Sequence, residues 1–176
     1  MSSAEPHVGV LVHDQFQELE FWYPVLRLRE EGIAVTVLGA EGERTYMSQL
    51  GYPVIPDKAV SEVAAGDFDA VLLPGGGAAD CIAAERDLMG FVAAAAAGGL
   101  VIGAISEAPK VLAAAKLLRG RRVAGAPSIA AAVGEAGGEL SDDPVVVDGR
   151  LITARSADEL PAFFKALAKT LAAGRA

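Results

Sequence analysis

The stretch "LVIGAISEAPKVLAAA", residues 100–115, is the part of the chain that decides the fold. It begins as a continuous apolar run, which is typical of a parallel strand buried on both faces. After Ser106 the run continues with the character of a helix. Ser106 and Glu107 therefore stand where the chain changes direction between a strand and a helix, and this junction is one unit of an alternating β–α chain.

Similar apolar runs and helical segments alternate along the rest of the chain. The other expected strands are "HVGVLV" (7–12), "AVTVLGA" (34–40), "DAVLLPGG" (69–76) and "RRVAGA" (121–126). The expected helices are 18–31, 86–97, 107–118 and 157–173. This alternation predicts an α/β fold, a three-layer sandwich with a mostly parallel central sheet and helices on both faces.

Two further segments predict antiparallel pieces. Asp148-Gly149 lies between two apolar runs in "VVVDGRLIT" (145–153), which is a hairpin signal. Residues 43–57 predict a small antiparallel or irregular excursion.

Length and composition limit the class of protein. The chain has 176 residues, 52% of them hydrophobic, which suits one domain over residues 1–176. The net charge of −8 and the lack of a long basic run disfavour nucleic acid as a partner. No apolar stretch reaches the roughly 18 residues that a membrane span needs, and the first residues lack a signal-peptide pattern, so we expect a cytoplasmic protein with no membrane partner.

Polar residues follow three of the expected strands. They are His13-Asp14, the glycine loop "PGGGAAD" (74–80) and Ser106-Glu107. Because ligands gather at the carboxyl ends of parallel strands, this edge is the expected site. A sharp turn at Ser106 would expose its hydroxyl, and the amides of the glycine loop and of Glu107 could hold an oxyanion.

Several of these segments together resemble the ThiJ/PfpI superfamily, close to its PfpI-like intracellular peptidase and deglycase branch. They are "DQFQELEFWYPVLRLREEGIAVTVLG", "FDAVLLPGGGAAD", "AISEAPKVLAAAKLLRGRRVA", "PSI" and "PVVVDGRLITAR", which cover nearly the whole chain in a consistent order. The resemblance implies a flavodoxin-like sandwich that assembles as a homo-oligomer, a dimer or possibly a hexamer. It also implies a cysteine at the strand-to-helix turn, paired with a glutamate near the first helix.

The resemblance assigns roles to particular residues. Glu20 matches the family glutamate, Gly76 and the Glu107 amide match the oxyanion donors, with Gly77 beside them, and Ser106 stands where the cysteine is expected. Glu107 and Asp80 stand where the peptidases usually carry a histidine and an acid from a neighbouring subunit.

Other positions in the expected pocket also depart from the family pattern. Gln17 replaces a frequent acid, and Ala126 replaces a tyrosine or histidine, so we expect a wider, more apolar pocket for a small-molecule substrate. His13 is the one histidine expected at this edge, and whether it touches the ligand stays open. For Cys81, an inert thiol is favoured over a relocated nucleophile.

These substitutions favour proton transfer over the family's thiolate chemistry. A serine hydroxyl needs an adjacent base to become a nucleophile. Desolvation and the neighbouring Glu107 would raise the pKa of Glu20, which could then act as a general acid, without a metal or cofactor. The favoured function is therefore acid–base chemistry of the hydratase, dehydratase, isomerase or lyase type, or hydrolysis, on a fairly apolar carbonyl metabolite.

Two alternatives remain. One is a PfpI-like peptidase, glyoxalase or deglycase, with Ser106 as an engineered replacement for a cysteine. The other is a catalytically inactive member of the family that binds a ligand or serves in an assembly.

Overall fold

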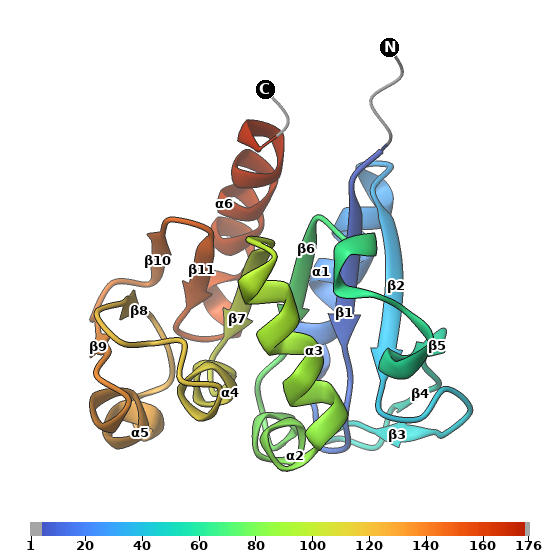
Figure 1. Ribbon diagram of the computed structural model, residues 1–176, viewed down its shortest axis with the longest axis horizontal. Coiled ribbons are helices and arrows are strands. Elements are labelled where there is room, and N and C mark those ends of the chain that lie inside the picture. The colour runs from blue at the N-terminus through green and yellow to red at the C-terminus, as the bar shows by residue number, and fades with distance from the viewer. Residues whose placement is uncertain (1–4, 175–176) are drawn as a thin grey trace.

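A seven-stranded sheet forms the centre of the protein, in the order β10-β11-β7-β6-β1-β2-β5 (Figure 1). The computed structural model describes residues 5–174. The strands are β1 (His7–Leu11), β2 (Ala34–Gly39), β5 (Lys58–Ala59), β6 (Ala70–Leu73), β7 (Val101–Ile105), β10 (Val145–Asp148) and β11 (Leu151–Ala154). Every pair of neighbours is parallel except β10 and β11, which form the predicted hairpin. The mostly parallel sheet is therefore confirmed.

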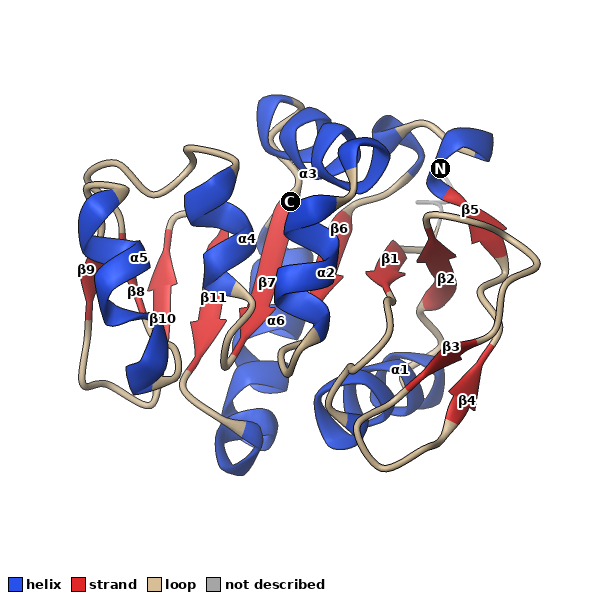
Figure 2. Ribbon diagram, turned by 90° about the horizontal axis from the view of Figure 1, so that it is seen from below, coloured by secondary structure: helices blue, strands red, loops and turns tan. Residues whose placement is uncertain are grey.

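Helices cover both faces of this sheet (Figure 2). On one side lie α1 (Glu18–Glu30) and α6 (Leu160–Ala173), and on the other lie α2 (Ala78–Ala84), α3 (Arg86–Ala97) and α4 (Pro109–Ala114). Short 3-10 helices occupy Val60–Glu62, Ala65–Asp67, Pro127–Ile129 and Ala157–Glu159. The three-layer α/β sandwich is thus present as predicted.

The burial of the central strands explains their uninterrupted apolar sequences. Every residue of β6 and β7 is buried, because helices cover both faces of the sheet at these strands. Helix α1 buries Phe21, Val25 and Leu28, which are spaced three and four residues apart and so share one face. Leu19 and Leu26 of the same helix remain 58% exposed.

The expected strand at 121–126 is wrong as a member of the central sheet. Only β8 (Arg122–Val123) forms there, and it pairs with β9 (Glu139–Leu140) in a separate two-stranded sheet. The place beside β7 is taken by β11, which the β10–β11 hairpin brings into parallel register with it.

Three helices differ from expectation. The helix expected over 107–118 is only α4, because Lys116 adopts a left-handed φ of 59° soon after the helix ends. Helix α2 was not predicted, and neither was α5 (Ala130–Glu135), which packs beside β9.

The excursion expected at 43–57 forms a small antiparallel hairpin of β3 (Tyr46–Met47) and β4 (Pro53–Val54). It lies against the segment that follows β1, where the Asp14 carboxylate accepts the Met47 N–H at 2.9 Å. This contact brings the hairpin to the edge at which β1 ends. Across residues 5–174, none of the helices has the length and apolar character needed to cross a bilayer.

At Gly103 the sheet and α6 pack closely. A Cβ at this position would lie 2.5 Å from Leu72 Cδ2 and 2.7 Å from Phe163 Cζ. Gly103→Ala should therefore lower the free energy of unfolding by about 1–3 kcal/mol through overpacking. Urea denaturation monitored by circular dichroism measures this change.

Gly90→Ala is the matched control, because a Cβ at Gly90 in α3 meets nothing within 4 Å. Alanine is favoured over glycine in a helix, so this variant should gain about 0.5–1 kcal/mol. Equal stability of the two variants would contradict the packing at Gly103.

Candidate active site

The loops that follow β1, β6 and β7 meet at one edge of the sheet, the edge toward the viewer in Figure 2. The Gln17 N–H donates to the Gly75 carbonyl at 3.3 Å, and Phe16 forms a bridge with Gly76. A Cβ on Gly75 would lie 2.7 Å from the Ile105 carbonyl oxygen at the end of β7. Three segments far apart in the sequence are therefore packed against one another here.

Ser106 adopts the sharp strand-to-helix turn that the sequence predicts. Its φ is 57°, in the left-handed region that non-glycine residues rarely occupy. Its N–H donates to the Ala154 carbonyl and its own carbonyl accepts the Ala126 N–H, both at 2.9 Å. Such a conformation costs of order 1–3 kcal/mol and persists where the surroundings hold it, as they do here.

Glu20 lies in the first turn of α1 and points into the protein, with 4% of its surface exposed. Its Oε2 accepts the Gly75 N–H at 2.9 Å. The Gln17 side chain caps the helix by accepting the Glu20 N–H at 2.8 Å. Gln17 therefore fixes the start of the helix and, through it, the place of the Glu20 carboxyl group.

The pKa of Glu20 is raised to about 7. Burial is the largest cause, and the negative charge of Glu107 raises the pKa further. Hydrogen bonding with the Gly75 N–H and the Ser106 side chain acts in the opposite direction. Near neutral pH both the protonated and the ionised form are therefore accessible, so the group can donate or accept a proton.

Glu107 brings a second carboxylate to the same place. Its Oε2 accepts the Gly76 N–H at 2.8 Å. A Cβ on Gly75 would lie within 3.0 Å of both Glu20 Oε2 and Glu107 Oε2, so only glycine fits between the two carboxyl groups. The Gly76 amide, predicted to bind an oxyanion, is thus occupied by a carboxylate of the protein itself.

Ala126 is half-buried and lies beside Ser106, because its N–H donates to the Ser106 carbonyl. Gly77 precedes α2, where its carbonyl accepts the N–H groups of Asp80 and Cys81. The Asp80 side chain is 69% exposed and forms an ion pair with Lys110 of α4. Asp80 therefore joins two helices, and its contacts are away from the two glutamates.

His13 is buried but faces other partners. Its Nδ1 accepts the Asp14 N–H at 2.8 Å, its Nε2 lies 3.7 Å from Glu85 Oε1, and its ring packs on Tyr46. Burial lowers the pKa of His13, which favours the neutral ring. Neither ring nitrogen is directed at the Ser106 hydroxyl.

Cys81 is half-buried, and its environment does not activate it. Burial raises the pKa of the thiol, and the charges of Asp14 and Asp80 raise it further. The thiol therefore stays protonated at neutral pH, which favours the inert interpretation.

Gln49 is a neighbour of the site that sequence reasoning missed. Its Nε2 lies 3.0 Å from the point where a Cβ on Gly76 would stand. Its N–H donates to the Phe16 carbonyl at 3.0 Å, which fixes the β3–β4 connection here. No local signal marks this residue, because only tertiary packing brings it to the glycine loop. In the part of the chain that is described, three or more His, Cys, Asp or Glu side chains do not group as metal ligands.

Comparisons with known proteins agree with this architecture. A model described as the DJ-1/PfpI family matches residues 6–170. A Bacillus subtilis protein, whose name describes an unproven cysteine protease, is 36% identical over 156 residues, 89% of this chain and 92% of its own. Protein/nucleic acid deglycase 2 of Escherichia coli is 33% identical over 168 residues, 94% of this chain and 98% of its own.

A solved structure shows the same fold. A two-domain protein of Anabaena variabilis, with DJ-1/ThiJ/PfpI-like and ferritin-like domains, superposes with a TM-score of 0.93 at 32% identity. The match covers 96% of this chain and 48% of that one. By sequence and by fold, this chain belongs to the DJ-1/PfpI family.

Proposed function

We propose that the protein is an enzyme that transfers protons on a small, fairly apolar carbonyl compound, with Glu20 as the general acid. The raised pKa of Glu20, about 7, beside Ser106 and opposite Glu107 is the observation that supports this most. Two carboxyl groups whose surroundings differ are a frequent arrangement for an acid and a base.

The steps follow from the positions of the groups. The substrate carbonyl oxygen takes the place of Glu107 Oε2 at the Gly76 amide, which frees the Glu107 carboxylate. Glu107 then accepts a proton from the carbon next to the carbonyl while Glu20 donates its proton to the oxygen, which leaves an enol. With an α-hydroxy carbonyl compound the intermediate is an enediol: Glu107 returns its proton to the former carbonyl carbon while the other hydroxyl gives its proton to Glu20, which completes an isomerisation. With a β-hydroxy carbonyl compound the enol gives its proton back to Glu20 while the β-hydroxyl leaves as water with the proton held by Glu107, which completes a dehydration.

Ser106 supports this chemistry without forming a covalent bond. Its hydroxyl interacts with the Glu20 carboxyl group and would hold both that group and the substrate oxygen in place. In this proposal Ser106 occupies the position of the family's cysteine but acts as a hydrogen-bonding group. Ala126, whose side chain is a single methyl group, leaves room for an apolar substrate.

A second candidate function is hydrolysis, which the names of the relatives suggest. The strained turn at Ser106 is the geometry of a nucleophile elbow. In that reaction Glu20 must be deprotonated, because it would remove the Ser106 proton. The two candidates therefore predict opposite dependences on pH around 7.

Exchange of solvent deuterium into small aldehydes and ketones, followed by proton NMR, tests the acid–base proposal. The rate should fall as pH rises above about 7, because Glu20 loses the proton that it donates. Glu20→Gln should lower the rate by about 10²–10⁴-fold, the usual contribution of a general acid. Glu30→Gln, at the exposed end of α1, is the matched control and should leave the rate unchanged.

A measurement of the stability of Glu20→Gln checks that the variant folds. The folded-state pKa of Glu20 lies above its unfolded value of 4.5, so its contribution to stability is present below pH 4.5 and is lost as pH rises through 7. At pH 8 the free energy of unfolding of the variant should exceed that of the wild type by up to about 3 kcal/mol, since a neutral amide costs less to bury than a carboxylate.

Other outcomes of the activity test would favour the alternatives. A rate that rises through pH 7 and vanishes in Ser106→Ala would favour the hydrolase instead, and inactivity throughout would favour a binding protein.

Glu107→Gln isolates the second carboxyl group. Loss of its charge removes one cause of the raised pKa of Glu20, so the fall in rate should begin at a lower pH. The maximal rate should also drop, because the proposed base is gone. Titration of ¹³C-labelled glutamate carboxyl groups by NMR measures the shift directly, and an unchanged Glu20 titration would contradict the coupling of the two groups.

We also propose that the protein works as a homo-oligomer, a dimer or possibly a hexamer. Large apolar side chains are exposed on α1 and on or just after the β3–β4 hairpin, namely Leu19, Leu26, Met47, Leu50, Tyr52 and Ile55, and the Leu50 N–H donates to Glu18 Oε1 of α1, which places the two elements side by side. Clusters of this kind mark interaction surfaces.

Sedimentation should therefore give a multiple of 18.0 kDa, and Leu50→Glu should lower the assembled fraction at least about tenfold. Val147→Glu, at an exposed residue of β10, is the control that should leave assembly intact. A single 18.0 kDa species in the wild type would overturn the proposal.

A further inference from the structure

A buried histidine lies at the carboxyl end of β1, apart from the two glutamates. His13 is 6% exposed, and its Nδ1 accepts the Asp14 N–H at 2.8 Å. A ring nitrogen that accepts carries no proton, so the neutral ring has its proton on Nε2. Among the buried side-chain nitrogen and oxygen atoms of residues 5–174, His13 Nε2 is the one without a hydrogen-bond partner, because Glu85 Oε1 stays 3.7 Å away. A buried unpaired donor is rare in a folded protein and calls for a physical reason.

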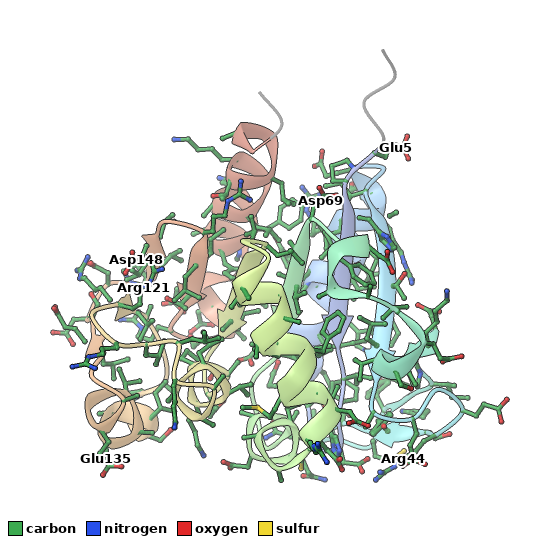
Figure 3. The ribbon with its side chains drawn as sticks, viewed as in Figure 1. Glu5, Arg44, Asp69, Arg121, Glu135 and Asp148 are labelled. Carbon is green, nitrogen blue, oxygen red and sulfur yellow. The ribbon has the colours of Figure 1, made fainter. Side chains whose placement is uncertain are left out.

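The residues that follow His13 hold the β3–β4 hairpin against the sheet. Asp14 Oδ1 accepts the Met47 N–H at 2.9 Å, and the Gln15 N–H donates to the Met47 carbonyl at 2.7 Å. Arg44, at the lower end of the sheet in Figure 3, forms an ion pair with Asp14 Oδ2 at 2.6 Å. Gln15 makes its contact with a left-handed φ of 66°, which a non-glycine residue rarely adopts. Docking of the hairpin therefore depends on the exact conformation of this segment.

A proton on His13 Nδ1 is incompatible with that conformation. Both ring nitrogens of an imidazolium are donors, so Nδ1–H and the Asp14 N–H would face each other. At the same time the charged ring would attract the Glu85 carboxylate, whose side chain is 44% exposed and has room to move. The neutral ring therefore favours the docked segment, and the charged ring favours a shifted one in which Glu85 pairs with Nε2.

The groups around the ring determine the pH at which it gains this proton. They are Asp14 after β1, Arg44 before β3, Tyr46 of β3, Glu85 at the junction of α2 and α3, and Cys81 of α2, which lies near Asp14. Burial lowers the pKa of His13 and so does Arg44, whereas the charges of Asp14 and Glu85 raise it. The net direction is downward from 6.5, so the ring is neutral at pH 7 and becomes charged only in mild acid.

We propose that His13 is a pH-sensitive switch, whose neutral ring keeps the β3–β4 hairpin docked and whose protonation in mild acid releases the hairpin from the edge of the sheet. The hairpin connection brings Gln49 to Gly76 and carries the exposed side chains of Leu50 and Tyr52. Its release would uncover the glycine loop and displace apolar side chains from the surface of the protein. The inference does not depend on the proposed chemistry, because neither Glu20 nor Ser106 takes part in it.

Hydrogen exchange of the full chain, measured by NMR between about pH 5 and pH 7.5, tests the switch. The amides to follow are those of Gln15, Met47 and Gln49, which donate across the junction between hairpin and sheet. Their protection factors should fall in acid. By linkage, the fall should approach ten raised to the difference between 6.5 and the pKa of His13 measured in the same samples.

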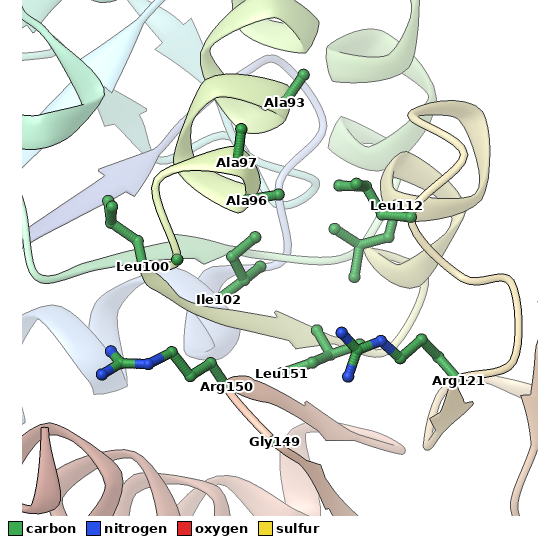
Figure 4. Close-up of a pocket in the computed structure, with 12 residues that line it drawn as sticks. Ala93, Ala96, Ala97, Leu100, Ile102, Leu112, Arg121, Gly149, Arg150 and Leu151 are labelled. Carbon is green, nitrogen blue, oxygen red and sulfur yellow. The ribbon is translucent and has the colours of Figure 1, made fainter.

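An internal control comes from the opposite end of the sheet. Residues 100–102 lie there beside an apolar cavity of about 480 Å³ (Figure 4), and the Val101 and Ile102 N–H groups donate to backbone carbonyls. Their protection factors should stay constant over the same range of pH, because no contact of His13 reaches them.

His13→Asn removes the titration but keeps an acceptor, since the asparagine Oδ1 stands close to the position of Nδ1. The dependence on pH should disappear in this variant. His7→Asn is the matched control, because His7 is the other histidine of the chain and lies at the start of β1. Its hairpin should be released in acid as in the wild type.

Glu85→Gln tests the second contact of the ring and serves alone should His13→Asn fail to fold. Loss of the Glu85 charge should lower the pKa of His13, so release should need a lower pH than in the wild type. Glu20 titrates near pH 7, in the same range. Glu20→Gln should nevertheless keep the release, which separates this inference from the proposed function.

Four outcomes would overturn the inference. They are constant protection of the hairpin amides across the range, an unchanged dependence on pH in His13→Asn, a His13 titration at or above 6.5, and loss of the dependence in Glu20→Gln, which would assign it to that carboxyl group instead.

Discussion

The burial of one carboxyl group is the constraint on which the site depends. An ionised carboxylate is expensive to remove from water unless hydrogen bonds replace its hydration. Glu20 receives one backbone N–H, from Gly75, and interacts with Ser106, yet its pKa still rises to about 7. The hydrogen bonds therefore offset only part of the cost of burial. The fold accommodates the group by letting it keep a proton through most of the acidic range, and a perturbed pKa of this kind is more frequent at functional sites than elsewhere.

The backbone around this carboxyl group adopts conformations that few residues can occupy. Gly75 has no room for a Cβ between the two glutamates, Gly76 has a φ of 73°, and Ser106 holds a left-handed φ without being glycine. All three conformations occur at the carboxyl edge of the central strands. The strands themselves follow the simple rule of apolar, buried, parallel sheet. Among residues 5–174, two of the three non-glycine residues with a left-handed φ, Gln15 and Ser106, lie at this edge, whereas the third, Lys116, follows the end of α4.

Much of this arrangement is predictable from sequence because it depends on local patterns. Continuous apolar strands, the helix that carries Glu20 and the turn at Ser106 each have a signal within a few residues. No local sequence signal marks the position of β8, because long-range pairing decides whether β8 or β11 lies beside β7. Gln49 reaches the glycine loop only through the β3–β4 hairpin. The bond between Glu107 and the Gly76 amide depends on a side-chain conformation, which no sequence pattern specifies.

That bond also bears on which molecules can enter. The Glu107 carboxylate lies beside Glu20, whose pKa its negative charge raises, so this site carries negative charge. An anionic substrate would meet this field and would also have to compete with Glu107 for the Gly76 amide. A neutral carbonyl compound meets no such repulsion, and its oxygen can accept the same N–H once Glu107 turns away.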